Sequence, residues 1–162
     1  MKIYPPERNL AEVIRAKRGI SADQIDQIIF RYTPPCSKLK SSHFHFDHCI
    51  PFASYFPAAT ALFGPGSVEG AKPGWPSDPN SIGLSDFLDK SHSNARNVDE
   101  LPPSNQHGWQ SFGPFHRAWD LWEDGSLWLI DAPGHAVGNL IAAARLEGGH
   151  WIVMGGDCAH SK

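Results

Sequence analysis

Three histidines and one aspartate stand within six residues of this chain, at His43, His45, Asp47 and His48. In an extended segment alternate side chains point to opposite faces, so His43, His45 and Asp47 would share one face while the two intervening phenylalanines enter a core. A bend at Asp47 would bring His48 round to the same cavity. Imidazole and carboxylate together suit zinc, iron and similar ions, so the motif predicts a hydrolytic or redox metal centre. The alternative is a histidine-rich surface loop.

Length and composition indicate one globular domain. The chain has 162 residues, of which 41% are hydrophobic and 19% are charged, and its 15 glycines and 14 prolines make it rich in loops. Lys and Arg number 14 against 17 Asp and Glu, for a net charge of −3, and no stretch gathers positive charge. This balance disfavours nucleic acid as a partner.

The cysteines bear on the cellular compartment. Cys36, Cys49 and Cys158 cannot all pair, and they lack the spacing of a disulfide framework, which favours a reducing compartment. The N-terminus lacks the features of a signal peptide, and no apolar run approaches the length of about 20 residues that spans a membrane. We therefore expect a soluble cytoplasmic protein without a membrane partner. Its oligomeric state is left open.

The first part of the chain predicts a helix and then a strand. Apolar residues at helical spacing predict an amphipathic helix over 9–18, with Asn9 as a possible N-cap and Gly19 as the stop. The β-branched run at 25–30 predicts a buried strand aimed at the histidine motif. A polar, proline-bearing stretch at 31–41 separates the two, and it cannot continue a central strand.

After the motif, the chain predicts a short helix over 50–56, a strand over 59–63 and then a long loop that extends to about residue 113. Loops of such length are usually functional or disordered, so this one could wall a substrate pocket. Aromatic residues would either line that pocket or only anchor the loop to the surface; they are Trp75, Phe87, Trp109 and Phe112.

Two β-hairpins are predicted in the last third, over 115–131 and 139–154, each with a glycine-containing turn. The first hairpin leads into His135, and the second leads into Asp157 and His160. Polar candidates therefore stand where strands end, as binding residues often do. Of the remaining histidines, His92, His107 and His116 are interpreted as solvent-facing, with a substrate role as the alternative, and His150 as structural.

Three motifs in order resemble the metallo-β-lactamase superfamily: Ser-His-Phe-His-Phe-Asp-His at 42–48, Pro133-Gly134-His135, and Gly155-Gly156-Asp157. More narrowly, the stretch 131–138 and the Gly-Gly-Asp ending look like the branch that contains N-acyl-homoserine lactonases and their fungal relatives. The resemblance implies an αββα sandwich that holds two metal ions, usually zinc. It implies that the first ion is held by His43, His45 and His135, that the second is held by Asp47 and His48, and that Asp157 bridges them.

The chain departs from this family pattern in three places. The second metal normally receives a later histidine, for which His160 is the downstream candidate, as a substitute ligand or as an outer residue. The family's N-terminal strands are not apparent, and its strand normally joins the histidine motif directly, which makes 31–41 an insert. We therefore expect a single α/β (α+β) domain over 1–162. Its fold would be an incomplete αββα metallo-β-lactamase sandwich with a long loop-rich insertion, truncated at both ends.

The resemblance implies a metal-dependent hydrolase. A hydroxide held between two metals would attack the carbonyl carbon of a small lactone, ester or related acyl substrate, because coordination lowers the pKa of water from 15.7 to roughly 7. Asp47 would orient the nucleophile and take part in proton transfer, or act as a ligand alone. Two alternatives stay open: a catalytically impaired metal-binding remnant, and a mono-iron oxygenase of the same fold.

Overall fold

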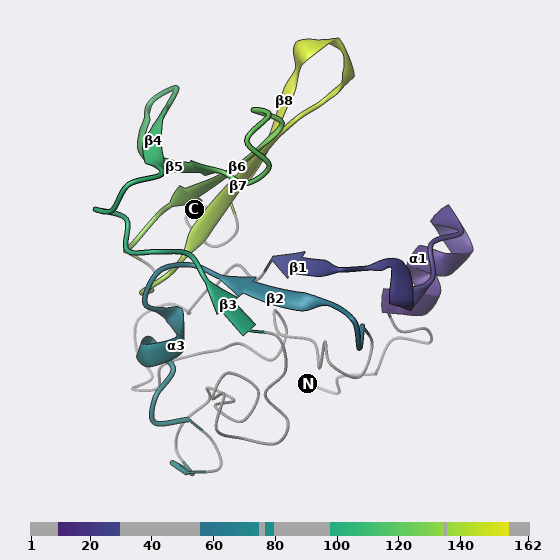
Figure 1. The fold of residues 1–162 in the computed structure, drawn as a ribbon, viewed down its shortest axis with the longest axis horizontal. Helices are drawn as coiled ribbons and strands as arrows, with labels where there is room; N and C mark the ends of the chain where they lie inside the picture. Colours follow the sequence, from purple (N-terminus) through teal and green to yellow (C-terminus); the bar gives the residue numbers. More distant parts are fainter. Residues whose placement is uncertain (1–9, 30–55, 75–76, 80–97, 135, 156–162) are drawn as a thin grey trace, which may run out of the picture.

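The structure is a computed structural model, and it describes residues 10–29, 56–74, 77–79, 98–134 and 136–155. Figure 1 labels its elements. These are α1 (Leu10–Arg18), η1 (Ala22–Gln24), β1 (Gln27–Ile29), β2 (Thr60–Phe63), α3 (Ser67–Gly70), β3 (Val98–Glu100), β4 (Trp109–Phe112), β5 (Phe115–Asp120), β6 (Leu127–Asp131), β7 (Leu140–Arg145), η3 (Glu147–Gly149) and β8 (Trp151–Met154). Of the helices in these residues, none has the length and apolar character needed to cross a membrane.

The first helix matches its prediction. α1 ends where Gly19 adopts a left-handed conformation (φ 71°), and the Gly19 N–H donates to the Arg15 carbonyl at 2.9 Å. Val13 and Ile14 are half-buried, whereas Leu10 is exposed. The helix therefore buries only a narrow apolar face, and none of its residues is fully buried.

A three-stranded parallel sheet follows in the order β1-β2-β3. The predicted strands at 25–30 and 59–63 are confirmed as β1 and β2, and Ile29 pairs with Leu62. β2 lies in the centre, and three of its residues, Ala61, Leu62 and Phe63, are buried. Because the strands are parallel, their carboxyl ends meet at one edge of the sheet.

A five-stranded antiparallel sheet has the order β4-β5-β6-β7-β8. Both predicted hairpins are confirmed, as β5–β6 and β7–β8. β6 and β7 pair along their length, from Leu127 opposite Ala144 to Asp131 opposite Leu140, and so join the two hairpins into one sheet. Leu129 and Ala143 in these central strands have no exposed surface.

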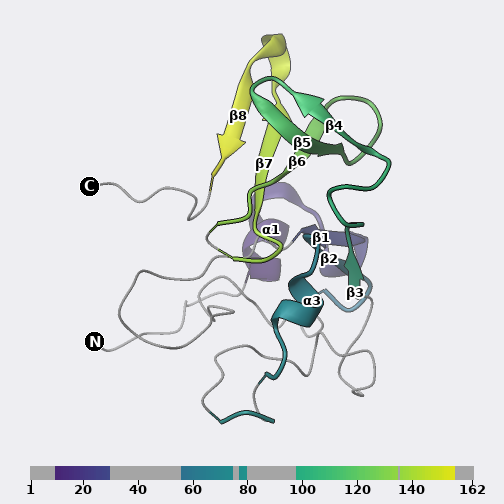
Figure 2. The same cartoon turned by 90° about the vertical axis from the view of Figure 1, so that its left-hand side faces the viewer.

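Part of the core lies between the two sheets, and a second cluster, Ala118, Ile130 and Ala143, belongs to the five-stranded sheet alone. One cluster of buried leucines joins the two sheets: Leu62 from β2, Leu101 just after β3, Leu129 from β6 and Leu140 from β7. Ile29 from β1 and Trp119 from β5 pack against this cluster. Figures 1 and 2 show the five-stranded sheet above the three-stranded one in both views. Apolar contact between distant strands therefore holds the sheets together.

The prediction of one continuous loop over 64–113 needs correction. This segment contains the single turn of α3 and the strands β3 and β4. β3 carries one apolar residue, Val98, followed by Asp99 and Glu100, so it shows no strand pattern of its own and forms through parallel pairing with β2. β4 likewise forms through pairing with β5.

Two other predictions, the insert at 31–41 and a helix at 50–56, fall on residues that the structure does not describe, apart from Phe56. The described part is mostly β, with one parallel and one antiparallel sheet and few helices.

Candidate metal centre

All the predicted ligands lie outside the residues that the structure describes: His43, His45, Asp47, His48, His135, Asp157 and the substitute candidate His160. Within the described ranges, no group of three or more His, Cys, Asp or Glu side chains gathers to hold a metal ion. The geometry of the site is therefore built from the described segments that lead to each motif.

The strands that precede the motifs end at one place in the molecule. β6 and β8 both run antiparallel to β7, and they end opposite its first half, where Asp131 faces Leu140 and Met154 faces Ala142. Asp131 leads to the His135 connection, and Met154 leads through Gly155 toward Asp157. The five-stranded sheet therefore directs two of the three motifs to the same end.

The parallel sheet meets this end through β2. The carboxyl end of β2 continues into Gly64, and the Gly64 backbone approaches the Gly138 backbone closely enough that a Cβ on Gly64 would lie 2.1 Å from the Gly138 carbonyl oxygen. β1 ends beside β2, with Ile29 opposite Leu62, and the histidine motif follows β1 in the chain. Ends of strands from both sheets thus converge on one corner.

The connection 132–139, which carries His135, is closed at its base by Asn139. The Ala132 N–H donates to the Asn139 carbonyl at 3.0 Å, and the Asn139 Nδ2 donates to the Ala132 carbonyl at 2.9 Å. The Asn139 N–H also donates to the Ala136 carbonyl at 3.2 Å. Asn139 has no exposed surface and Ala132 is half-buried, so the bonds between them are partly shielded from water.

The same connection is fixed against the segment that follows β2. Gly138 has a φ of 75°, and a Cβ there would lie 1.9 Å from the Ser67 hydroxyl oxygen and 2.9 Å from the Gly64 carbonyl oxygen. Ser67 is buried, with 2% of its surface exposed. Glycine is required at this position both for its backbone conformation and for the close approach.

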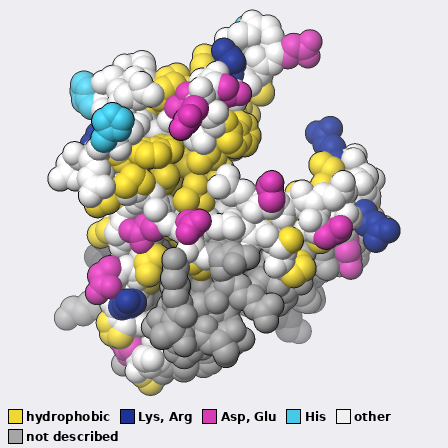
Figure 3. All heavy atoms as spheres, viewed as in Figure 1, with side chains coloured by type: hydrophobic (Ala, Val, Ile, Leu, Met, Phe, Trp, Pro, Cys, Tyr) yellow, Lys and Arg dark blue, Asp and Glu magenta, His cyan; other side chains and the backbone are white. Residues whose placement is uncertain are grey.

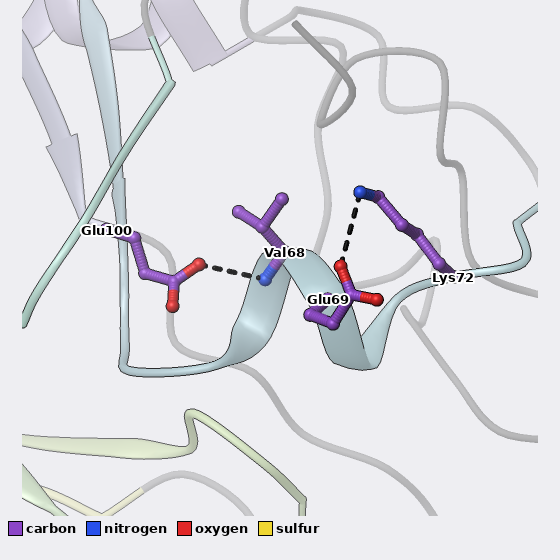
Figure 4. A network of polar contacts seen from close by, with 4 residues as sticks. All are labelled: Val68, Glu69, Lys72 and Glu100. Carbon is purple, nitrogen blue, oxygen red and sulfur yellow. Dashed lines mark hydrogen bonds and ion pairs between the residues drawn. The ribbon is translucent and has the colours of Figure 1, made fainter. Parts of the chain in front are cut away.

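A carboxylate from β3 holds the Gly64–Gly70 corner in turn. Glu100 accepts hydrogen bonds from the Gly66 N–H and, at 3.1 Å, from the Val68 N–H, at the start of α3. Figure 4 shows the Glu100 carboxylate pointing at the first turn of α3, beside a separate ion pair between Lys72 and Glu69 at 3.3 Å. Three elements are therefore linked, from β3 through α3 to the His135 connection.

An ion pair lies just before this connection. The Arg117 Nε is 3.3 Å from the Asp131 Oδ2, and the side chain of Asp131 is 6% exposed against 48% for that of Arg117. The two residues face each other across the β5–β6 pair. Asp131 therefore ends β6 with its charge already balanced.

Other predicted candidates fall away from this corner. His107 and His116 are exposed, as predicted, whereas His150, which was predicted to be structural, is also exposed; His92 lies outside the described residues. Trp109 packs edge-on against Trp119 with ring centres 5.7 Å apart, and Phe112 stacks on Trp128 at 4.8 Å. Trp109 and Phe112, the two predicted candidates, thus belong to the five-stranded sheet. Trp75 and Phe87 lie outside the described residues.

Sequence reasoning missed three residues that support the site: Ser67, Glu100 and Asn139. Ser67 and Glu100 contact residues that are distant in the sequence, and Asn139 acts through one buried side chain. Such contacts leave no local sequence pattern from which they could be predicted. The only sequence signal is the Gly138-Asn139 pair just before a strand, which predicts a turn and nothing more specific.

Comparison with known proteins gives partial relatives. The metallo-hydrolase mfmC of Annulohypoxylon moriforme is 43% identical over 122 residues, which cover 74% of this chain and 30% of the relative. The gamma-lactamase MBL2 of Gibberella moniliformis (strain M3125 / FGSC 7600) is 34% identical over 147 residues, covering 89% of this chain and 54% of the relative. This chain is homologous to part of a fungal metallo-hydrolase and to part of a fungal gamma-lactamase. The resemblance to the metallo-β-lactamase superfamily is thereby confirmed.

A third relative, the cytochrome P450 monooxygenase mpaDE' of Penicillium brevicompactum, is 33% identical over 159 residues, which cover 94% of this chain and 17% of the relative. The chain therefore spans between 17% and 54% of the length of these three relatives. No protein-family model matches the chain, and no solved structure gives a significant match.

Homology to a metallo-hydrolase implies a metal. The side chains available for it are the imidazoles of His43, His45, His48 and His135 and the carboxylates of Asp47 and Asp157. Imidazole nitrogen and carboxylate oxygen are the donors that zinc and similar divalent ions accept in hydrolytic sites. The donor set therefore fits such an ion.

Proposed function

We propose that this chain is a metal-dependent hydrolase that opens a small lactone, lactam, ester or related acyl substrate. The observation that carries the proposal is the convergence of strand ends on one corner, from which the chain continues into His135 and toward Asp157. Homology to a protein named as a metallo-hydrolase and to one named as a gamma-lactamase supports the reaction class. Zinc is the proposed metal, with two ions as the family resemblance implies.

When bound, zinc would lower the pKa of water and polarise a carbonyl group. In the proposal, His43, His45 and His135 would hold one ion, Asp47 and His48 would hold the other, and Asp157 would be a ligand shared by the two. The carboxylate of Asp47 would accept a proton at an Oδ atom when the nucleophile attacks. The buried base of the 132–139 connection would keep its backbone in one conformation throughout the reaction.

A purified-protein assay tests this proposal. The chain is loaded with zinc, and turnover is measured on a panel of γ-lactones, γ-lactams and simple esters, for the wild type and for the double variant His43→Ala/His45→Ala. We expect the double variant to lose at least about 100-fold in kcat/KM, because outer-shell changes alone commonly cost 10–100-fold and ligand loss costs more. His107→Ala is the matched control, since His107 is exposed and far along the chain from every motif.

Unchanged turnover in the double variant would refute the proposal. Zinc bound by the wild type without turnover on any substrate would instead support the metal-binding form that lacks catalysis. Binding of a single iron with consumption of dioxygen would support the oxygenase alternative.

A further inference from the structure

A buried carboxamide lies at the base of the connection that carries His135. Asn139 has no exposed surface, and its Nδ2 donates to the Ala132 carbonyl at 2.9 Å. The backbones of the same two residues also bond, from the Ala132 N–H to the Asn139 carbonyl at 3.0 Å. The two ends of the connection are therefore tied once through the backbone and once through a side chain.

The β6–β7 pairing does not need this side chain. The two strands already pair from Leu127 opposite Ala144 to Asp131 opposite Leu140. A fully buried position beside a core leucine would ordinarily hold an apolar residue, because a buried amide must find partners to offset its desolvation. The presence of asparagine here therefore indicates that its hydrogen bond to Ala132 has a task other than holding the strands.

That task is visible in how the two arms of the connection are held. The second arm (136–139) is fixed at Gly138, whose backbone packs against Ser67 and Gly64 and leaves no room for a Cβ. Among the described residues, the first arm (132–134) makes no comparable contact: Pro133 and Gly134 are exposed, and a Cβ on Gly134 would meet nothing within 4 Å. The Nδ2 bond of Asn139 to Ala132 ties the first arm to the second.

We propose that Asn139 is a positioning residue of the metal centre, whose side-chain amide sets the path of the arm that leads to His135. This inference rests on the proposed function, in which His135 is a metal ligand. Asn139 acts through the backbone and does not touch the metal or the substrate. Its loss should weaken metal binding, because the ligand would be presented in several orientations where one is needed.

The test compares zinc affinity and stability in two variants, each of which loses one side-chain hydrogen bond at one end of β6. Asn139→Ala removes the side-chain bond across the connection at one end of β6. Asp120→Ala removes the bond that the Asp120 Oδ2 accepts from the Gly125 N–H at 2.8 Å, across the turn at the other end of β6. Asn139→Ser, whose hydroxyl is too short to reach Ala132, replaces the alanine variant if that one does not fold.

Three quantities are measured on the purified chain. They are the zinc dissociation constant by competition with a chromophoric chelator, the visible absorption of the cobalt-substituted protein, and hydrogen exchange of residues 132–136 without metal. In Asn139→Ala we expect the zinc dissociation constant to rise about tenfold, the cobalt spectrum to change and the exchange to accelerate. In Asp120→Ala we expect both metal readouts to match the wild type even where stability falls.

The outcomes separate this inference from the proposed function. If the wild type binds zinc and both Asn139 variants bind it within twofold of the wild type, the inference is wrong and the function stands. An equal loss of affinity in Asp120→Ala would also overturn it, because general destabilisation would then account for the effect. If the wild type binds no zinc, the proposed function and the inference fall together.

Discussion

Gly138 occupies a position where a side chain has no space. Its φ of 75° lies in the left-handed region, and a Cβ would lie 1.9 Å from the Ser67 hydroxyl oxygen, which is itself buried. Both requirements, backbone conformation and close approach, come from the corner at which the two sheets meet. The contact of Gly138 with Ser67 therefore fixes the backbone just before β7, at one end of the connection 132–139.

Gly138→Ala should lower the free energy of unfolding by about 2–5 kcal/mol, as the sum of left-handed backbone strain and overpacking. Gly113→Ala is the control, since Gly113 has a φ of 55° and open space around it, and it should cost only about 1–2 kcal/mol. Urea unfolding of the three proteins measures the difference. Equal losses in the two variants would show that the contact with Ser67 is unimportant.

The pH dependence of one surface turn can be worked out from Asp124. Hydrogen bonds from the Ser126 hydroxyl and the Ser126 N–H, the latter at 2.9 Å, hold the pKa of the Asp124 carboxyl below its usual value. A lowered pKa means that the stabilisation is present above the ordinary value and is lost as the pH falls through the lowered one. Ser126→Ala should therefore raise the pKa of Asp124. An NMR titration of the Asp124 carboxyl carbon checks this, and an identical midpoint in both proteins would contradict it.

Among the elements, α3 depends most on a distant residue. It has four residues, too few for a helix to be stable alone, and its N-cap is Gly66, which offers no side chain. Glu100 supplies the missing acceptors from β3. One carboxylate thus shapes the corner that Gly138 contacts.

Glu100→Ala should lower the free energy of unfolding by about 1 kcal/mol, in the range found for lost N-caps. Glu69→Ala is the matched control in the same small network, because its ion pair with Lys72 is exposed (44% for Lys72 and 83% for Glu69) and should contribute under about 0.5 kcal/mol. Thermal unfolding at fixed pH compares them. A larger loss in Glu69→Ala would show that the corner is held by the ion pair.

One of the two outer strands of the antiparallel sheet, β8, is exposed along its whole length. All four residues of β8 are exposed, and each is apolar: Trp151, Ile152, Val153 and Met154. Figure 3 shows apolar side chains at the surface over the five-stranded sheet. An outer strand of this kind offers its edge to other chains, and natural proteins often protect such edges with lysine.

Val153→Lys should therefore reduce aggregation on warming, measured by light scattering, with little change in stability. Trp122→Lys is the control, because Trp122 is 59% exposed but lies in the turn after β5 and not on an edge. Either change makes the net charge of −3 one unit less negative, so charge repulsion alone would not improve solubility. An equal improvement in both variants would mean that exposed apolar area, and not the edge, drives aggregation.

At the scale of the whole molecule, the described strands that precede the predicted ligands in the sequence end where the two sheets meet. Motifs follow strands of both sheets, β1 on one side and β6 and β8 on the other, and the buried leucines already join these sheets. A metal bound by ligands from both would add a second connection. Metal binding should therefore be coupled to the stability of the entire fold.

Zinc should raise the free energy of unfolding by about 2.7 kcal/mol when free zinc is 100 times the dissociation constant. His135→Ala should remove most of this gain, and His107→Ala should keep it. Urea unfolding with and without a chelator measures the effect. A gain that persists in His135→Ala would place the bound zinc elsewhere on the protein.

The predictability of the fold follows the range of the interactions. α1 and the two hairpins were predictable because helical spacing, Gly19 and glycine-containing turns act within a few residues. β3 was not, since a strand of Val98, Asp99 and Glu100 exists through its pairing with β2. The single turn of α3 likewise needs Glu100, which lies 34 residues from Gly66.

For the site, the sequence by itself predicted the chemistry: clustered imidazoles and carboxylates at His43, His45, Asp47 and His48 favour a metal centre, because ligand preference belongs to the side chain. Only the tertiary structure decided the support, in which Gly138 meets Ser67 and Asn139 closes the connection that carries His135. Such contacts depend on how the two sheets lie against each other, and that arrangement is set by the buried leucines from separate strands acting together.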